Sequence, residues 1–246
     1  MGPVKFFANS NAIHSQRILH IGAHEGQEKE AYFMLGFEDT FWIEAIPEVF
    51  ERLKNRVGES NCAAALMWSS SNEKIMFKIA NNELSSSAFS FTDESPFSNL
   101  RMVNEIELQT QTLDSLILEG ILNRDFLDRA ILVLDVQGSE IEVLKGSIKS
   151  ISLFSAICVE VSKKHVYYGG AKYREIDLWV KSHGYKKIGQ WVNDPMTGHG
   201  DALYVAKSVS VGIKSLLIGK CISLFYILYL LFRALERRGL IKLTML

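Results

Sequence analysis

Short apolar runs alternate with amphipathic segments along most of the chain. Strands are predicted over residues 18–23, 40–45, 131–136 and 155–162, and helices over residues 27–35, 47–57, 112–120, 139–151 and 173–184. The helix at 47–57 shows why: Pro47 suits a first helical turn, and Val49, Leu53 and Val57 recur at helical spacing. Strands that alternate with helices predict βαβ units, and hence a doubly wound α/β fold around a mostly parallel sheet.

Two further β-like runs, residues 185–191 and 201–207, follow without a helix between them. The segment that joins them is too short for a comfortable parallel crossover, so the two runs are predicted to pair antiparallel. The sequence therefore predicts a parallel sheet that ends in an antiparallel hairpin.

The stretch from residue 62 to residue 111 is less regular. Residues 62–68 are a weaker strand candidate, and residues 73–80 alternate in part, as an edge strand does. A polar, serine-rich segment follows at residues 81–99. Because long loops inside compact domains are often functional, we expect residues 84–99 to cover the substrate.

The composition is that of an ordinary globular protein, with 48% hydrophobic residues, 22% charged residues and a net charge of −1. A chain without a basic excess is not expected to bind nucleic acid. Cys62, Cys158 and Cys221 lie far apart and lack zinc-ligand spacing, so free thiols in a reducing, cytoplasmic setting are predicted. The first residues lack the long apolar stretch of a secretory signal.

The composition shifts after residue 207 to a strongly apolar tail with a basic end. Residues 221–232 carry no charge, but this run is too short to span a bilayer, and extending it backwards would bury Lys214 and Lys220. We expect either peripheral membrane contact through residues 209–242 or packing of the tail in a homo-oligomer or on the domain. The predicted organisation is an N-terminal extension (1–16), an α/β domain (17–207) and a helical tail (208–246).

The first predicted strand ends in the turn Gly22, Ala23, His24, Glu25 and Gly26. Ligands of open α/β sheets bind beyond the carboxyl ends of the strands, and a glycine there lets the backbone approach a ligand closely. The spacing differs from the G-x-G-x-x-G pattern that cradles a pyrophosphate. By itself this turn fits a tight strand-to-helix connection as well as it fits a cofactor site.

Acidic residues follow two of the other strands. Glu44, next to Ala45, ends the second strand, where nucleoside-binding α/β proteins place an acid that accepts hydrogen bonds from the ribose hydroxyls. Asp135 ends the most apolar strand and is expected to lie beside the same ligand. Ser139 and Glu142 have the spacing of a helix capping box, and Glu140 is expected to interact with the dipole of that first helical turn.

In several segments the chain resembles the FkbM family of methyltransferases. The matching segments occur in the family's order and are HIGAHEGQE, WIEAIPEVFERLK, SSSAFSF, TLDSL, LVLDVQGSEIEVLKG, ICVEVS and DALYV. The resemblance implies a seven-stranded class I methyltransferase sheet and S-adenosyl-L-methionine as cofactor. It also implies methyl transfer, usually to oxygen on sugars or on polyketide- and glycan-type products. By this resemblance Gly22, Ala23, His24, Gly26 and Glu44 would hold the cofactor, and Asp135 would line its reacting end.

A sulfonium methyl group is already activated, so such an enzyme mainly has to align an in-line attack and exclude water. A sugar hydroxyl is barely acidic, so a base helps. The candidate catalytic residues are Asp135, Glu160 and His199. These residues and the nearby Asp201 show no recognised metal-ligand signature, and no metal is predicted.

Two alternatives stay open from the sequence. One is a nicotinamide-dependent oxidoreductase of similar topology, which the missing G-x-G-x-x-G pattern and the terminal hairpin disfavour. The other is a non-catalytic, membrane-associated module whose tail carries the function. The expected acceptor of the methyltransferase is a small molecule or glycan.

Overall fold

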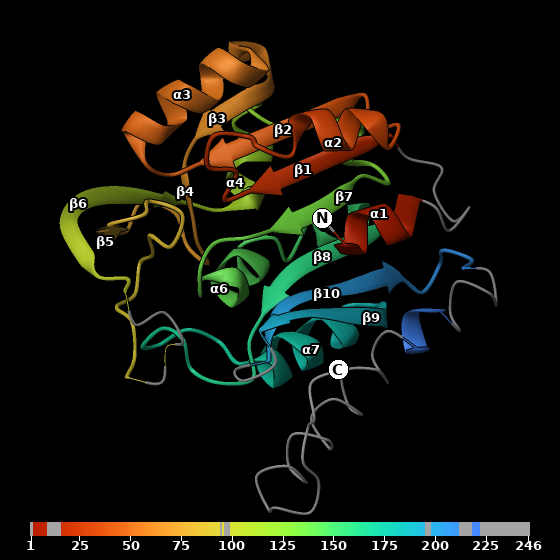
Figure 1. The fold of residues 1–246 in the computed structure, drawn as a ribbon. Helices are drawn as coiled ribbons and strands as arrows, with labels where there is room; N and C mark the ends of the chain where they lie inside the picture. Colours follow the sequence, from red (N-terminus) through yellow and green to blue (C-terminus); the bar gives the residue numbers. More distant parts are fainter. Residues whose placement is uncertain are drawn as a thin grey trace, which may run out of the picture.

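The main sheet of the protein has seven strands in the order β3-β2-β1-β7-β8-β10-β9 (Figure 1). The computed structural model describes residues 2–8, 16–93, 95, 99–194, 198–211 and 218–221. In sheet order the strands are β3 (Cys62–Ala64), β2 (Asp39–Glu44), β1 (Arg17–Ile21), β7 (Ile131–Leu134), β8 (Ala156–Val161), β10 (His199–Ala206) and β9 (Tyr185–Asp194). Pairing is parallel from β3 to β8 and antiparallel at β10 and β9. The predicted parallel sheet with a terminal antiparallel hairpin is confirmed.

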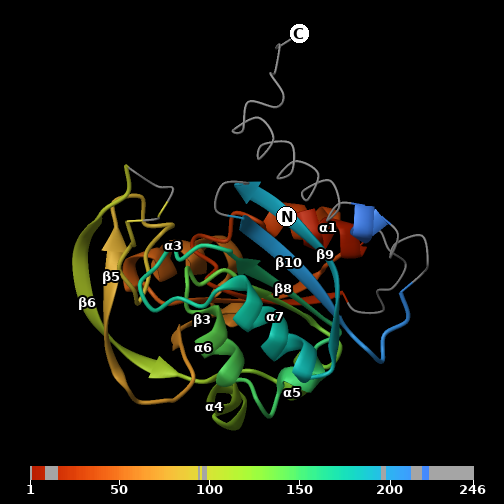
Figure 2. The same cartoon turned by 90° about the horizontal axis from the view of Figure 1, so that it is seen from below.

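Helices cover both faces of this sheet (Figures 1 and 2). One face carries α1 (Gly2–Ala8), α2 (Lys29–Met34) and α3 (Pro47–Val57); the other carries α4 (Leu113–Leu118), α6 (Glu140–Lys145) and α7 (Tyr173–Ser182). The alternation of side chains along β1 divides the core accordingly. Ile18 belongs to a cluster with Leu53 of α3, whereas Leu19 belongs to a cluster with Leu116 of α4 and Val180 of α7. Both faces of the parallel strands are thus buried, as their apolar runs require.

The predicted helix starts agree with the structure at α3 and α4 and differ from it at α6. The bounds predicted for α3 match the structure, and Thr112 and Ser115 form a capping box at the start of α4. The capping box predicted for Ser139 and Glu142 is wrong, because the Ser139 side chain makes no cap hydrogen bond. Glu142 instead pairs with Lys145 at 2.8 Å. The helix predicted over residues 139–151 is also shorter: after α6 the chain turns and enters the 3-10 helix η2 (Ile151–Leu153).

A second, three-stranded sheet stands beside the main one. It pairs β4 (Leu66–Met67) and β5 (Lys74–Ala80) with β6 (Met102–Gln111). The weak strand predicted at residues 62–68 therefore splits between two sheets at Ala65, whose N–H donates to the Glu44 carbonyl oxygen at 3.0 Å. The predicted edge strand is β5, at the edge of this second sheet. Its partner β6 was not predicted from the sequence.

Shorter elements complete the connections, namely the 3-10 helix η1 (Glu59–Asn61) and the helix α5 (Arg124–Leu127). Most of the predicted tail helix lies outside the described residues, so its contact with a membrane or an oligomer partner stays a prediction. Within the described parts of the chain, no helix is both long enough and apolar enough to cross a membrane.

Candidate active site

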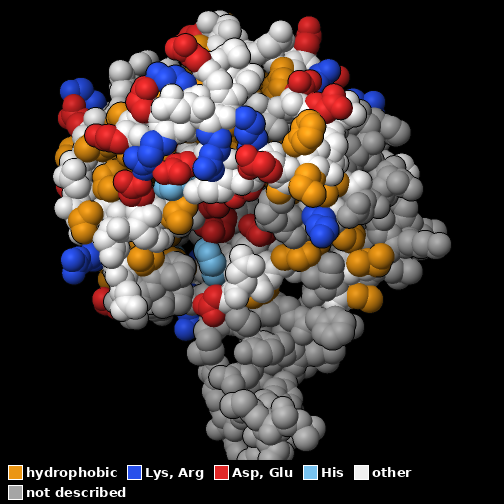
Figure 3. All heavy atoms as spheres, turned by 45° about the horizontal axis from the view of Figure 1, so that its top comes forward, with side chains coloured by type: hydrophobic (Ala, Val, Ile, Leu, Met, Phe, Trp, Pro, Cys, Tyr) orange, Lys and Arg blue, Asp and Glu red, His pale blue; other side chains and the backbone are white. Residues whose placement is uncertain are grey.

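The carboxyl ends of β1, β2, β7 and β8 meet at one edge of the main sheet. A pocket opens there, and its walls come from the turns after β1, β2 and β7 and from the second, three-stranded sheet and the loop after β5. Figure 3 shows a hollow on this side of the molecule in which acidic side chains and a histidine gather. The predicted residues Gly22, His24, Glu44, Ala45 and Asp135 all line the pocket. The strand-end rule for ligand sites thus brings together residues that are far apart in the sequence.

The turn after β1 is held tightly between its neighbouring strands. The N–H groups of Gly22 and Ala23 both donate to the Ile43 carbonyl oxygen of β2, at 3.0 Å each. Gly22 has a φ of +80°, and a Cβ atom at this position would lie 1.8 Å from the Asp135 carbonyl oxygen. His24 has a φ of +46°, which is unusual for a residue other than glycine. Only glycine at position 22 therefore lets the ends of β1 and β7 come together.

The Glu44 side chain holds the turn after β1 in place. It is 6% exposed, and its two carboxylate oxygens accept hydrogen bonds from the N–H groups of His24 and Ile46, each at 2.8 Å. Burial raises the pKa of Glu44, and these backbone hydrogen bonds oppose the rise. Each carboxylate oxygen can accept more than one hydrogen bond, so Glu44 retains capacity for the two ribose hydroxyls expected there.

The remaining predicted cofactor residues support the turn without lining the pocket. Ala23 is buried, and a Cβ atom on Gly26 would lie 2.9 Å from a Leu53 methyl group. The carboxylate of Glu25 accepts a hydrogen bond from Arg52 Nε at 2.6 Å. These residues shape the backbone of the turn and anchor it to α3.

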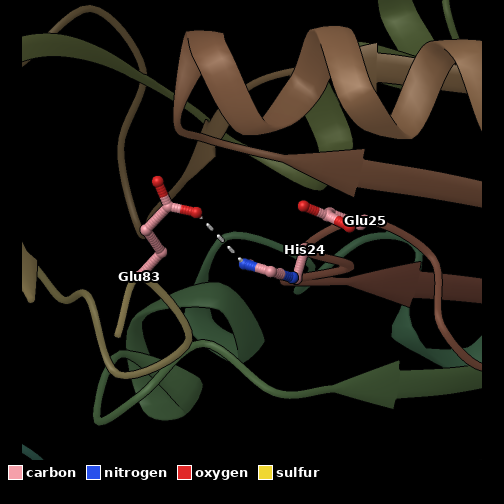
Figure 4. Close-up of side chains that lie close together, drawn as sticks. All are labelled: His24, Glu25 and Glu83. Carbon is pink, nitrogen blue, oxygen red and sulfur yellow. Dashed lines mark ion pairs between the residues drawn. The ribbon is translucent and has the colours of Figure 1, made fainter. Parts of the chain in front are cut away.

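His24, Glu25 and Glu83 place one potential metal-binding atom each within 4.8 Å of one another (Figure 4). His24 Nε2 lies 3.9 Å from the Glu83 carboxylate. Arg52 forms ion pairs with both Glu25 and Glu83, so the chain itself supplies the positive charge between these carboxylates. The arrangement joins the turn after β1 to the loop after β5.

Two polar atoms in the lining of this pocket have no hydrogen-bond partner, which suits the binding of the predicted cofactor. Ser139 Oγ and His24 Nε2 are buried and have no hydrogen-bond partner among the described residues. Both residues line the pocket, together with the apolar side chains of Ala45, Ile46 and Leu66. Apolar walls with a few unsatisfied polar atoms are typical of a site for an organic ligand.

The three predicted catalytic residues also come together. Gln137 Nε2 donates to Asp135 Oδ1 at 2.6 Å and to Glu160 Oε2 at 3.1 Å, and His199 Nε2 lies 3.1 Å from Glu160 Oε1. Asp201 of β10 lies opposite Glu160 of β8 in the antiparallel register of the sheet. This row of side chains runs from the cofactor pocket into a second pocket lined by Glu140, Glu160 and His199.

The charges of this row shift the pKa values of its members. Asp135 is accessible from the cleft but closely surrounded by protein; the loss of solvent and the charge of Glu160 raise its pKa well above the usual range, although the hydrogen bond from Gln137 opposes the rise. Burial and Glu160 raise the pKa of Asp201 to about 6 and that of Glu140 to about 7. Burial disfavours the charged form of His199, but its hydrogen bond to Glu160 and the surrounding carboxylates raise its pKa to about 9. His199 is therefore a cation at neutral pH.

Several residues of the site were not predicted from the sequence. Gln137 Oε1 accepts a hydrogen bond from the Tyr167 hydroxyl at 2.7 Å. The main-chain carbonyl oxygen of Gln137 accepts another from Ser87 Oγ at 2.6 Å. The Tyr167 hydroxyl also lies 3.2 Å from the Ser85 carbonyl oxygen. The serine-rich loop and the loop after β8 thus meet on Gln137. Gln137 has a φ of +54°, a strain that often marks functional turns but leaves no trace in the sequence.

The chain is similar in sequence to one methyltransferase family and in fold to other solved structures. The sequence matches the methyltransferase FkbM domain over residues 20–187, from β1 into β9. No curated protein sequence matches the chain. Three solved structures illustrate the similar folds. A candidate tRNA (m1A22) methyltransferase of Streptococcus pneumoniae, solved with S-adenosyl-L-methionine, is 8% identical and has a TM-score of 0.49, with 95% of this chain and 87% of that chain covered.

The fibrillarin pre-rRNA processing protein of Methanococcus jannaschii is 11% identical with a TM-score of 0.46, covering 80% of this chain and 68% of that chain. A TehB-like S-adenosylmethionine-dependent methyltransferase of Corynebacterium glutamicum is 10% identical with a TM-score of 0.43, covering 82% and 87%. The FkbM match extends over more than half of the chain. The chain therefore belongs to the FkbM family of methyltransferases, with S-adenosyl-L-methionine as its cofactor.

Proposed function

We propose that this methyltransferase transfers the methyl group to a hydroxyl oxygen of a sugar, glycan or natural-product acceptor, with Asp135 as the proton acceptor. One observation carries the proposal. Gln137 Nε2 bridges Asp135, which lines the cofactor pocket, and Glu160, which lines the neighbouring pocket. A base therefore stands where the two pockets adjoin, and the family match favours methyl transfer over the nicotinamide-dependent alternative.

On the cofactor side, the protein binds and orients. Gly22 brings the backbone close to the ligand, and Glu44 accepts hydrogen bonds from the ribose hydroxyls. The bound cofactor supplies an activated sulfonium methyl group. Asp135 lines the same pocket, so its negative charge favours a cation beside it.

On the acceptor side, the pKa values distinguish the three candidates for the base. The raised pKa of Asp135 makes its carboxylate a stronger base than an ordinary one, which suits the removal of a hydroxyl proton. His199, with a pKa of about 9, already holds a proton at neutral pH and cannot accept another. We assign His199 to the orientation of Glu160, with which it forms an ion pair at 3.1 Å.

The charge of the acceptor pocket supports a small or neutral acceptor over a nucleic acid. Asp135, Glu140, Glu160 and Asp201 lie near one another, as their mutual effects on pKa values indicate, and the basic side chains that line the acceptor pocket are His199 and Lys164. Nucleic-acid sites place Lys and Arg against the phosphates, because counterion release drives binding there. With more acidic than basic side chains around it, this pocket suits a neutral acceptor better than a polyanion.

The cofactor pocket is narrow in this structure, with a volume of about 50 Å³. Ligand pockets usually reach roughly 300–1,000 Å³. Glu83, Leu84 and Ser86 of the loop after β5 line the pocket, and Leu84 is 54% exposed. We propose that this part of the loop moves aside to admit the cofactor and then covers the reacting groups, which keeps water out of the transfer step.

Turnover on defined acceptors tests the proposal. The purified full chain is incubated with S-adenosylmethionine labelled on its methyl group and with panels of sugars, glycan precursors, polyketide alcohols, amines and RNA. We expect label on a hydroxyl acceptor, and we expect Asp135→Asn to lower turnover about 100-fold or more, as the loss of a general base does. Its affinity for S-adenosylhomocysteine, which carries no sulfonium charge, should stay close to that of wild type. Label only on an amine or on RNA would contradict O-methylation, and turnover of the variant within about threefold of wild type would remove Asp135 as the base.

A further inference from the structure

Ser139 is a buried hydroxyl for which the protein provides no partner. It follows the turn after β7 and is 2% exposed. Its Oγ atom makes no hydrogen bond with any described residue, and its side chain does not cap α6. The Glu142 N–H, which a Ser139 cap would have bonded through its side chain, donates instead to the main-chain carbonyl oxygen of Ser139 at 3.0 Å.

Other buried serines of the same region differ from Ser139. Ser147 Oγ donates to the Leu144 carbonyl oxygen at 2.7 Å, and Ser150 Oγ donates to Asp114 Oδ1 at 2.6 Å. Buried hydroxyl groups in folded proteins are nearly always paired in this way, because an unpaired one loses its hydration without compensation. An orphaned hydroxyl such as Ser139 Oγ requires a partner that the protein alone does not supply.

The position of Ser139 indicates what that partner is. Ser139 lines the same pocket as Gly22 and Glu44, and the apolar side chains of Ile46 and Leu66 form part of the same walls. A purine has apolar faces that suit such walls, and polar atoms on its edge that both donate and accept hydrogen bonds. A serine hydroxyl can also do both. Glu44 is already assigned to the ribose.

We propose that Ser139 Oγ hydrogen-bonds the nucleoside half of S-adenosylmethionine, at the adenine edge. This inference rests on the proposed placement of the cofactor between Gly22 and Asp135. It makes Ser139 a binding residue whose satisfaction depends on the ligand: the hydroxyl is unpaired in the free protein and paired in the complex.

Calorimetry and thermal unfolding of Ser139→Ala test the inference, with S-adenosylhomocysteine as the probe. In the free protein we expect the melting temperature to stay the same or to rise, because the substitution removes an unsatisfied group. The dissociation constant for S-adenosylhomocysteine should rise by about 5- to 10-fold, as for one lost hydrogen bond. Ser139→Cys keeps the shape with a weaker donor and should also weaken binding without loss of stability.

Two controls locate the contact. Ser147→Ala removes a paired hydroxyl away from the pocket, so it should lower the melting temperature and leave the dissociation constant unchanged. Methylthioadenosine lacks the amino-acid half of the cofactor, and its affinity should fall by the same factor as that of S-adenosylhomocysteine in Ser139→Ala. A loss seen only with S-adenosylhomocysteine would place the contact on the amino-acid half and overturn the inference.

The remaining outcomes separate this inference from the proposed placement of the cofactor. If wild type binds S-adenosylhomocysteine and Ser139→Ala binds it within twofold of wild type, a water molecule satisfies the hydroxyl and only the inference on Ser139 fails. If Ser139→Ala lowers the melting temperature as Ser147→Ala does, Ser139 is structural. If Glu44→Ala and Ser139→Ala both bind as wild type does, the cofactor lies elsewhere and both proposals fail.

Discussion

The two sides of the cleft are built in different ways. The cofactor side consists mainly of backbone: Gly22 and Ala23 donate to one carbonyl oxygen of β2, and Glu44 accepts two backbone N–H groups. The acceptor side consists of side chains from distant segments that meet on Gln137 and Glu160. The first is set by the way parallel strands end, whereas the second depends on individual side chains placed by loops.

This difference has a functional consequence. A backbone-built site binds the part of the reaction that is the same in every turnover, namely the cofactor. A side-chain network on loops can change with the acceptor while the sheet stays the same, since loops tolerate sequence change better than the strands they connect. Substitutions of Gly22 and Glu44, which hold the backbone of the cofactor side, should therefore lower stability and cofactor affinity together. Substitutions on the acceptor side should lower stability or turnover without lowering cofactor affinity.

The largest effect is expected from Gly22→Ala. A Cβ atom at this position would lie 1.8 Å from the Asp135 carbonyl oxygen, and the φ of +80° is costly for alanine. We expect a loss of about 3–5 kcal/mol of stability and no measurable binding of S-adenosylhomocysteine. Gly36→Ala is the control, because its φ is +86° but no atom lies within 4 Å of the added Cβ. Equal urea midpoints for the two variants would show that the close approach of β1 and β7 does not matter.

Glu44→Ala should come next. It removes the acceptor of the ribose hydroxyls and also leaves the His24 and Ile46 N–H groups without their carboxylate partner. We expect a loss of about 2–3 kcal/mol in cofactor binding, measured by calorimetry, with a parallel loss of stability. Glu25→Ala alters the same turn, but Glu25 does not line the pocket. Equal affinities in the two variants would remove Glu44 from the cofactor site.

The acceptor side can be probed through the titration of His199. Its pKa of about 9 in the folded protein exceeds the ordinary value of 6.5, so the folded state holds this proton more tightly than the unfolded state does. The resulting stability is present in full below pH 6.5 and is lost as the pH rises through 9. Between pH 7 and pH 9 we expect wild type to lose on the order of 2 kcal/mol. His199→Gln should flatten this part of the pH profile in urea unfolding, and an unchanged slope would contradict the ion pair with Glu160.

The sequence predicted the cofactor side far better than the acceptor side, for a physical reason. Glu44 and Asp135 each follow an apolar run, and the ends of parallel strands must converge, so alternation alone places both residues in one cleft. Glu160 was predicted for the same reason, and His199 because it directly precedes the predicted final strand. Gln137, Tyr167 and Ser87 join through loops separated by 30 and 50 residues, and no periodicity in the sequence encodes such contacts.

The errors in the prediction also have local causes. β6 was missed although its apolar Ile106 and Leu108 alternate with Glu105 and Glu107, because this alternation covers only a short part of a mostly exposed strand next to the polar loop. The cap predicted at Ser139 was wrong because the backbone of Ser139 is not extended as a cap residue usually is, and the Glu142 N–H donates to its main-chain oxygen at 3.0 Å and not to its side chain.

The smallest effect is expected from Tyr167→Phe, which tests whether the two loops act as one cover. The substitution removes the hydrogen bonds from the Tyr167 hydroxyl to Gln137 Oε1 and to the Ser85 carbonyl oxygen. Because the ring stays in place, we expect a loss of only about 1 kcal/mol of stability. Limited proteolysis within residues 81–101 should become faster, because the serine-rich loop loses an anchor on the loop after β8. Tyr173→Phe is the matched control, because its hydroxyl donates to Asp177 Oδ1 at 3.3 Å within α7 and not to a residue of this loop. Equal cleavage rates in the two variants would contradict the inference that the Tyr167 hydroxyl anchors the serine-rich loop.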